Sequence, residues 1–360
     1  MGLRREHPMK FSGPVVLIGG NGDVGKRLVP MLLDHVVCPV LLVSRRGGTS
    51  HDAVEALQFD ISAEGAADKL PPGATVVNLT EATPPSVAAQ VVRAGGIFLD
   101  TSATPDYVRA LRQAMADAGG PGTGVLCVGT APGLSTLMAA DAAGAEGTEV
   151  IDIGVELGMG RHYGKAATEW SINAFGAGYR LSGDENRTVR PGDVRRRFAF
   201  GQNECGRATL GVGFPVDGIA EYRVEVAPPL VRTFLALDPP WMTPLVGLLL
   251  RFGIGPVLAR RKRGLTRFLM RLPELGQART RIAVEAHGAN GEVSASRHFT
   301  GGDQADVTAA MILATICVVH TSGPVRGATT VSDHLSLDRA LNDLRGLLPG
   351  MAIKAWSTGS

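Results

Sequence analysis

The feature that most constrains this chain is the stretch GPVVLIGGNGDVGKRLVPMLL at residues 13–33. Its first part is a short, apolar, β-branched run typical of a strand covered on both faces, and its last part has the apolar spacing of a helix. Between them, Gly20, Gly22 and Gly25 form GxGxxG, and Gly19 extends the pattern to an overlapping GxxGxxG. A strand, a glycine turn and a helix in this order predict a βαβ unit that binds a dinucleotide.

Each glycine has a physical task in such a turn. A side chain would block the tight turn, the approach of backbone N–H groups to a pyrophosphate, or the contact of helix with strand. The negative phosphates then rest at the positive end of the helix. The alternative is a turn that needs glycine only for its shape. The residues expected at the cofactor are Gly20, Asn21, Gly22, Asp23, Val24 and Gly25.

The end of the second predicted strand, CPVLLVSRR, indicates which dinucleotide is bound. A carboxylate at this place would accept hydrogen bonds from a ribose 2′-OH and repel a 2′-phosphate. The chain instead has Ser44, Arg45 and Arg46, a hydroxyl and two guanidinium groups that suit a dianionic phosphate. We therefore expect NADP(H) over NAD(H); the alternative is a solvated loop with two incidental arginines. After the third predicted strand, Asp60 is placed either to cap the adenine or to form a simple turn.

Length and composition narrow the class of protein. At 360 residues the chain exceeds the size at which single cores stop growing, about 250 to 300 residues, so we expect two domains. A formal net charge of +2 gives no long-range field for a nucleic-acid backbone, and we set nucleic acid aside. The four cysteines are far apart without metal-ligand spacing, which predicts no metal site and a reducing compartment. Because no apolar run of signal-peptide length precedes the first strand, we expect a cytoplasmic protein.

Three further stretches carry a resemblance to a known family. Residues 74–110 read as a strand ending in Asn, a Pro-rich turn, a helix and a strand ending in Asp-Thr-Ser, and GVLCVGTAPG at 124–133 runs from a strand into Gly-x-x-Pro-Gly. Residues 286–341 look like last strands, a long helix and a closing turn. Together they resemble the saccharopine dehydrogenase-like reductases. The resemblance covers most of residues 13–345 and is weakest between 160 and 275.

The resemblance implies an α/β fold. An N-terminal Rossmann domain with a doubly wound parallel sheet, residues 1–135, would precede a second α/β (α+β) domain with a broad mixed sheet, residues 136–318. Residues 319–360 would pack back on the Rossmann domain. Members of the family often form homodimers, bind NADP(H) or NAD(H), and typically reduce an imine formed from an amine and a carbonyl compound. Relatives act on other C=N, C=O or C=C bonds.

The same resemblance places further residues near the cofactor. Thr80, Glu81 and Ala82 would lie where a loop passes the ribose and pyrophosphate. Thr101, Ser102 and residues 130–133 would approach the nicotinamide side. These are short polar side chains at strand ends, where open α/β sheets bind ligands. Thr and Ser in such places often satisfy only nearby backbone groups, which is the alternative for each of them.

The segment RHYGKAATEWSINAFGAGY, which begins at residue 161, is the candidate for the substrate side. Hydride transfer to a carbonyl or imine carbon needs a group that stabilises or protonates the heteroatom, and Lys, His and Tyr can do this near neutral pH. Our candidates, in order of preference, are Lys165, His162 and Tyr163; the alternative for each is a structural role. Just before them, EVIDIGVELGMG reads as a strand with Asp152 and Glu156 on one side.

Residues 227–265 are apolar, punctuated by Pro and Gly, and end in the basic run RRKR. A membrane span is disfavoured, because Arg251 interrupts the apolar run well short of the roughly 20 residues required. A hydrophobic lid and a helical dimer interface are the favoured interpretations. Contact with a membrane surface, with Arg260 to Arg263 near anionic head groups, is a further and less favoured one.

These inferences lead to one functional hypothesis and two alternatives. We expect an NADPH-dependent reductase of a C=N (imine) or C=O group in a small metabolite. The apolar 241–258 region favours, as an alternative within enzymes, an enoyl reductase for a lipid-like or polyketide substrate. The other alternative is a non-catalytic NADP(H)-binding protein, because the resemblance offers no single catalytic acid that can be matched here.

Overall fold

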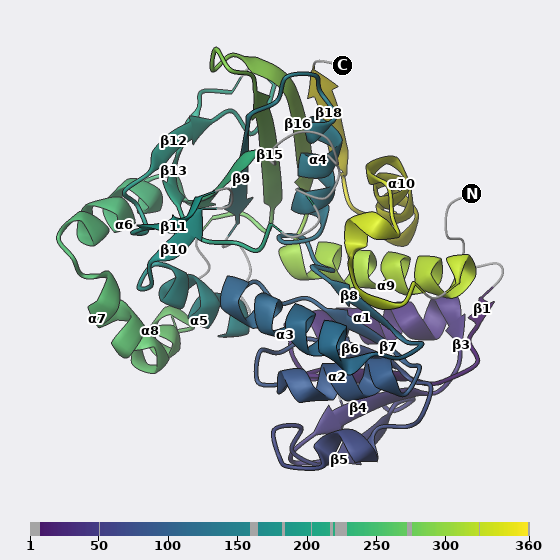
Figure 1. The fold of residues 1–360 in the computed structure, drawn as a ribbon. Helices are drawn as coiled ribbons and strands as arrows, with labels where there is room; N and C mark the ends of the chain where they lie inside the picture. Colours follow the sequence, from purple (N-terminus) through teal and green to yellow (C-terminus); the bar gives the residue numbers. More distant parts are fainter. Residues whose placement is uncertain are drawn as a thin grey trace. The chain divides into compact units, whose positions relative to one another are not determined.

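The structure is a computed structural model of the 360-residue chain. The chain divides into two compact units. Unit 1 comprises residues 1–134 and 305–350, and unit 2 comprises residues 135–304 and 351–360 (Figure 1). The residues that the structure describes are 8–49, 51–158, 165–181, 184–202, 204–216, 219, 229–271, 276–323 and 325–358.

Unit 1 is built on a seven-stranded parallel sheet in the order β17-β8-β7-β6-β2-β4-β5. The chain runs outward from β2 to β4 and β5, and then returns to β6 on the other side of β2. The switch point of this doubly wound sheet therefore lies between β2 and β6, where such sheets bind ligands. The predicted Rossmann arrangement is confirmed. The strands are β2 (Val15–Ile18), β4 (Val40–Ser44), β5 (Glu55–Gln58), β6 (Thr75–Asn78), β7 (Ile97–Asp100), β8 (Thr123–Leu126) and β17 (Gly327–Thr330).

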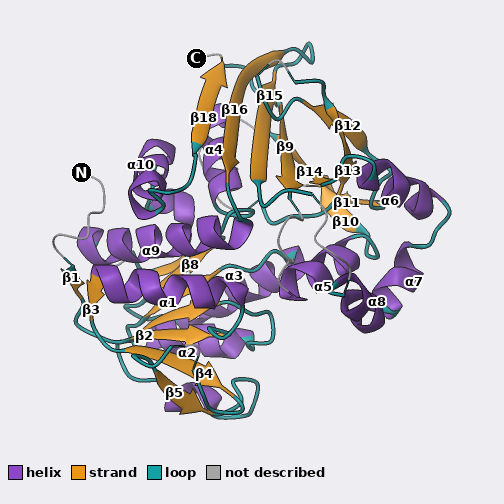
Figure 2. Ribbon diagram, turned by 180° about the vertical axis from the view of Figure 1, so that it is seen from behind, coloured by secondary structure: helices purple, strands orange, loops and turns teal. Residues whose placement is uncertain are grey.

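Helices cover both faces of this sheet (Figures 1 and 2). Helices α2 and α3 pack on the face formed by Val16, Val76 and Phe98, because the apolar stripes of both helices meet these side chains. The other face is covered by α1 and α9, which are joined by an ion pair between Arg27 Nε and Asp306 Oδ1 at 2.7 Å. The helices of unit 1 are α1 (Asp23–His35), α2 (Pro85–Arg93), α3 (Pro105–Ala118), α9 (Gln304–Ser322) and α10 (Leu337–Leu347).

Several shorter elements complete this unit. A two-stranded parallel sheet pairs β1 with β3, next to the start of the chain's described part. Two 3-10 helices follow β5 and β17. These elements are β1 (Met9–Lys10), β3 (Val36–Val37), η1 (Ala66–Lys69) and η3 (Val331–Asp333).

Within the described residues, α9 is the one helix long and apolar enough to cross a membrane, but 78% of its apolar window is buried inside the protein. Its last turn is tied to the sheet by a hydrogen bond of 2.8 Å between Thr75 Oγ1 and His320 Nε2. The ring of His320 also stacks on Phe11, with 3.9 Å between the ring centroids. These contacts make α9 a core helix of unit 1.

Unit 2 contains the predicted broad mixed sheet, in the order β12-β13-β14-β9-β15-β16-β18. Its central strand β9 runs parallel to β14 and antiparallel to β15. The separate pair β10-β11 is antiparallel. The strands are β9 (Val150–Leu157), β10 (Tyr179–Leu181), β11 (Asp184–Val189), β12 (Arg195–Phe198), β13 (Arg207–Gly211), β14 (Leu230–Leu237), β15 (Thr280–His287), β16 (Val293–Gly301) and β18 (Lys354–Thr358).

The helices of unit 2 are α4 (Leu134–Ala143), α5 (Lys165–Ala174), α6 (Met242–Arg251), α7 (Gly255–Arg260) and α8 (Lys262–Leu269).

The limits of the two units differ from the domain limits predicted from the sequence. Unit 1 resumes at residue 305 and not at 319, because the whole apolar length of α9 belongs to its core. The last residues belong to unit 2, because β18 pairs with β16.

Candidate functional site

The glycine turn between β2 and α1 is shaped by contacts that leave no room for side chains. Gly19 has φ +82°, a conformation that favours glycine, and it passes the carbonyl of Leu79 at the switch point. A Cβ on Gly25 would lie 2.1 Å from the carbonyl oxygen of Gly20, so only glycine lets α1 approach the turn this closely. Gly20 itself packs on the buried side chain of Leu42. Glycines of both overlapping patterns, GxGxxG and GxxGxxG, therefore stand where the turn has no room for a side chain.

The start of α1 has the properties of an anion site. Gly22 is the N-cap residue and offers no side-chain cap, and the first N–H groups of a helix lack intrahelical partners, so these groups can donate to an anion. Asp23 is the acidic residue in this first turn, and its carboxylate accepts a 2.6 Å hydrogen bond from Arg27. This ion pair offsets the negative charge that would otherwise oppose a phosphate. Val24 and Gly25 continue the same turn.

The loop that carries the two arginines lies next to the glycine turn. Asn21 Nδ2 donates a 3.2 Å hydrogen bond to the carbonyl of Gly48, and Ser44 Oγ donates to the carbonyl of Gly47. Arg45 and Arg46 are exposed. Neither guanidinium has a hydrogen bond or ion pair to a residue that the structure describes. The structure thus brings two available cations to the loop beside the proposed pyrophosphate site.

Asp60 follows β5 and forms a turn. Its Oδ1 accepts hydrogen bonds from the Ser62 N–H, at 3.0 Å, and from the Ser62 hydroxyl, at 2.7 Å. These bonds, followed by the nearby charge of Arg45, lower the pKa of Asp60. The geometry agrees with the turn interpretation of this residue, and a contact with adenine stays a prediction.

A buried hydrogen-bonded network lies where β6 and β7 end. Asn78 Nδ2 donates to Asp100 Oδ1 at 2.6 Å, and Asn78 Oδ1 accepts from the Thr83 hydroxyl at 2.7 Å. Asp100 also accepts from the backbone N–H and the hydroxyl of Ser102, both at 2.9 Å. The hydroxyl of Thr101 donates to the carbonyl of Asn78 at 3.0 Å. Thr101 and Ser102 therefore both satisfy local groups in this structure, and their approach to the nicotinamide stays a prediction.

Burial raises the pKa of the Asp100 carboxyl to about 6, against the opposing effect of its hydrogen bonds from Asn78 and Ser102. The carboxyl is fully enclosed. Neither Asn78 nor Asp100 was among our candidate residues, although both end the strands on which the resemblance rests. The signal that could have found them is a polar residue at the end of a buried strand, next to a second one in register.

We predict that stability depends on pH through Asp100. Its pKa is about 6 in the folded chain against a usual value of 3.8, so ionisation disfavours the folded state. The free energy of unfolding should fall by roughly 2 to 3 kcal/mol as the pH rises from below about 4 to above about 6. Denaturant titrations at the two ends of this range should show a smaller fall in Asp100→Asn. An equal fall in parent and variant would contradict the prediction.

Glu81 has a structural task that the sequence interpretation missed. Its carboxylate accepts hydrogen bonds from the N–H groups of Ala103 and Thr104, at 3.2 and 3.0 Å, and from the Thr104 hydroxyl at 2.7 Å. Because Thr104 is the N-cap residue of α3, Glu81 ties the loop after β6 to the start of that helix. In the same loop, the N–H of Ala82 donates to the hydroxyl of Thr80 at 3.2 Å. Contacts of these three residues with a ribose or pyrophosphate stay predictions.

The segment after β8 is as tightly built as the glycine turn. Cys127 is buried and has φ +59°, which is unusual for a residue with a side chain. A Cβ on Gly133 would lie 2.0 Å from the carbonyl oxygen of Gly129. The hydroxyls of Thr130 and Thr308 share a 2.8 Å hydrogen bond, which joins this segment to α9. The loops after β2, β6, β7 and β8 thus all lie at the carboxyl edge of one sheet.

The candidates for the substrate side belong to unit 2. His162 and Tyr163 lie outside the described residues. Lys165 begins α5, but its side chain also lies outside the described residues. The roles proposed for these three residues stay predictions.

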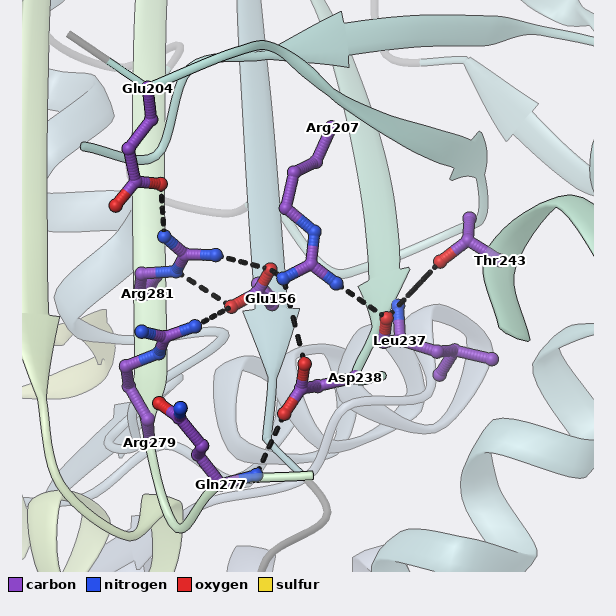
Figure 3. A network of polar contacts seen from close by, with 9 residues as sticks. All are labelled: Glu156, Glu204, Arg207, Leu237, Asp238, Thr243, Gln277, Arg279 and Arg281. Carbon is purple, nitrogen blue, oxygen red and sulfur yellow. Dashed lines mark hydrogen bonds and ion pairs between the residues drawn. The ribbon is translucent and has the colours of Figure 1, made fainter. Parts of the chain in front are cut away.

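Beyond these candidates, the structure adds a network of buried charges on β9 (Figure 3). Glu156 is fully buried and binds three guanidinium groups. Arg281 donates to both of its carboxylate oxygens, at 2.6 and 2.7 Å, while Arg279 lies 3.4 Å away and Arg207 also pairs with it. Arg281 pairs in addition with Glu204.

A second cluster surrounds Asp152 on the same face of β9. Asp152 is fully buried, and Arg232 binds its two oxygens at 2.5 and 2.6 Å. Arg196 pairs with Asp152 and with Glu285 on β15. β12 is an edge strand of this sheet. Arg196, however, points inward to these carboxylates.

Between the two clusters lies an apolar layer of Phe198, Phe234 and Ala283. The Arg196 guanidinium lies 5.2 Å from the centre of the Phe198 ring. Each arginine in the clusters has a carboxylate partner, so the buried charges compensate one another within the sheet, and removal of one partner would leave a buried charge unpaired. Among the residues described, no group of three or more His, Cys, Asp or Glu side chains could hold a metal ion.

Comparison with solved structures shows which known proteins share this fold. No protein-family model matches the chain. The chain superposes on apo saccharopine dehydrogenase (L-Glu forming) from Saccharomyces cerevisiae with a TM-score of 0.61 and 13% identity, over 97% of this chain and 100% of that one. An engineered D-amino acid dehydrogenase aligns with a TM-score of 0.48 and 12% identity, over 90% of this chain and 95% of that one. The predicted resemblance to saccharopine dehydrogenase-like proteins is confirmed, at the level of the fold.

One curated sequence gives a short match. A segment of 56 residues is 36% identical to a highly reducing polyketide synthase from Aspergillus terreus. The segment is 16% of this chain and 2% of that protein, so the chain spans a very small part of its length. A match of this extent does not place the chain in a family.

Proposed function

We propose that the protein is an NADP(H)-dependent oxidoreductase that reduces a C=N or C=O group of a small metabolite. The observation that carries the proposal is the pairing of two features at one sheet edge. The turn at Gly19 to Gly25 leaves main-chain N–H groups open to a diphosphate, and the hydrogen bond from Asn21 to Gly48 sets the loop of Arg45 and Arg46 beside it.

The residues of this edge fit the parts of NADP(H). The first turn of α1 would hold the pyrophosphate, because its N–H groups lack intrahelical partners and a side-chain cap, and a Cβ at Gly25 would close the approach of helix to turn. Arg45, Arg46 and Ser44 would bind the 2′-phosphate, since guanidinium groups make charge-assisted hydrogen bonds to phosphate oxygens. The nicotinamide, when bound, supplies the hydride.

On the substrate side, the chain must bind the acceptor and supply a proton to its heteroatom. Lys165 is our first candidate for this group, followed by His162 and Tyr163, because each can donate a proton or a hydrogen bond near neutral pH. A cationic lysine would also hold a substrate carboxylate. Lys165→Met should therefore lower kcat and leave the Kd for NADPH unchanged; unchanged kinetics would remove Lys165 from the site.

Two observations favour a second candidate, an enoyl reductase for a lipid-like or polyketide substrate. One is the short sequence match to a highly reducing polyketide synthase, and the other is the apolar surface of α6 and α7. The choice between the candidates is open to a direct assay. The protein would be mixed with NADPH and with amine and carbonyl pairs, with ketones and with enoyl thioesters, and the loss of absorbance by NADPH would be followed.

Oxidation with the amine and carbonyl pairs or the ketones, and not with the enoyl thioesters, is the expected result. Oxidation with the thioesters alone would favour the second candidate. Tight binding of NADPH without oxidation on any of these would contradict both, and would favour a protein that binds the cofactor without turnover.

A further inference from the structure

The helix α6 has its apolar stripe on the outside. Trp241, Leu245, Leu248 and Phe252 recur at helical spacing on one side, and Trp241 and Phe252 are 58% and 74% exposed. The opposite side of the helix faces the sheet: a Cβ on Gly247 would lie 2.9 Å from Leu210, and the carbonyl of Gly247 accepts a hydrogen bond from Arg195. The helix therefore turns Thr243 and Gly247 to the core and exposes several of its large apolar side chains, while Leu250 packs inward toward Gly192.

The next two helices also carry exposed apolar side chains. Val257 in α7 is exposed, and Phe268 in α8 is 59% exposed. The three helices follow one another along the rim of unit 2, where α7 and α8 contact α5 (Figures 1 and 2). Six of the nine exposed large hydrophobic side chains found in the described residues belong to this segment: Trp241, Leu245, Leu248, Phe252, Val257 and Phe268. Such a concentration is unusual for a surface that faces only water.

The charge of the segment is of one sign. Residues 239–271 contain seven basic side chains and no Asp or Glu. Within the part of the chain that the structure describes, none of these seven forms an ion pair, and all except Lys262 are exposed. They are Arg251, Arg260, Arg261, Lys262, Arg263, Arg267 and Arg271.

This distribution distinguishes between the possible occupants of the surface. A symmetric contact with a second copy of the chain would set this basic patch against itself, with no carboxylate in the segment to offset the repulsion. A bilayer with anionic lipids offers an apolar boundary for the large side chains and a negative surface for the arginines. We propose that the surface formed by α6, α7 and α8 binds membranes that contain anionic lipids, by lying on them without crossing them.

Vesicle sedimentation with the full chain tests the proposal. Vesicles of phosphatidylcholine with and without phosphatidylglycerol would be used at low and high salt. Binding should require phosphatidylglycerol and weaken with salt, because the attraction is screened. Neutralising three arginines in Arg260→Gln/Arg261→Gln/Arg263→Gln should lower the partition coefficient about 100-fold, since each basic residue near such a surface contributes roughly five-fold. The pair Phe252→Ser/Phe268→Ser should also weaken binding.

The matched control is Val325→Ser/Arg326→Gln, which changes an exposed apolar and an exposed basic residue of unit 1 and should leave vesicle binding unchanged. Thermal unfolding checks that each variant is folded, and NADPH affinity, which should not change, keeps this test separate from that of the cofactor site. Absence of binding by the parent chain to phosphatidylglycerol vesicles would overturn the proposal. A parent dimer that Phe252→Ser/Phe268→Ser dissociates, with no vesicle binding, would overturn it in favour of a dimer interface.

Discussion

Glu156→Gln should lower the free energy of unfolding by about 3 to 5 kcal/mol, the cost of removing one partner from a buried ion pair. The carboxylate is fully buried and lies between Arg281, Arg207 and Arg279. Glutamine keeps the shape of the side chain, but it leaves the guanidinium groups with an uncompensated charge in the interior of unit 2. Denaturant unfolding of parent and variant measures the difference.

The control for this change is Glu149→Gln, just before the same strand. Glu149 is exposed, so the loss of its charge should change the free energy of unfolding by less than about 0.5 kcal/mol. A similarly small effect of Glu156→Gln would mean that the network of Figure 3 does not hold unit 2 together. An intermediate result would be expected for Asp238→Asn, because Asp238 lies at the edge of the network, 3.6 Å from Arg207.

The second large effect is on cofactor choice. Arg45→Ala/Arg46→Ala should raise the Kd for NADPH about 100-fold, because two charge-assisted hydrogen bonds to the 2′-phosphate are lost. The Kd for NADH should stay nearly constant, since NADH has no phosphate at that place. Titration of tryptophan fluorescence or calorimetry with each coenzyme measures both constants.

Arg109→Ala is the matched control for this pair of arginines. Arg109 is exposed in unit 1, but it pairs with Asp106 on α3, away from the glycine turn. Neither dissociation constant should change in this variant. Equal and small changes for both coenzymes in Arg45→Ala/Arg46→Ala would refute the assignment of the 2′-phosphate to these arginines.

The fold of unit 1 could be predicted because its signals are local. A strand, a glycine turn and a helix are contiguous in residues 13–33, and the structure keeps them in that order. The glycine pattern did not indicate which residue of the turn has a positive φ; in the structure it is Gly19 and not Gly20. The periodicity of β9 likewise placed Asp152 and Glu156 on one face.

What these two carboxylates meet could not be predicted. Their partners come from strands far away in the sequence, such as Arg196 on β12 and Arg281 on β15, and only the sheet order brings them together. The same holds for Glu81, whose cap on α3 depends on the adjacency of β6 and β7. For α6, composition indicated an apolar helix, but the side that packs on β13 is defined by the small residue Gly247 and not by the large ones.

The most direct test of the account is a titration of the folded parent chain with NADPH and with NADH. The turn that ends at Gly25 should bind the diphosphate of both coenzymes, and the arginines after β4 should add affinity for NADPH alone. We therefore expect binding of both, with NADPH about 100-fold tighter. Absence of binding of either coenzyme by folded protein would contradict the account at its base.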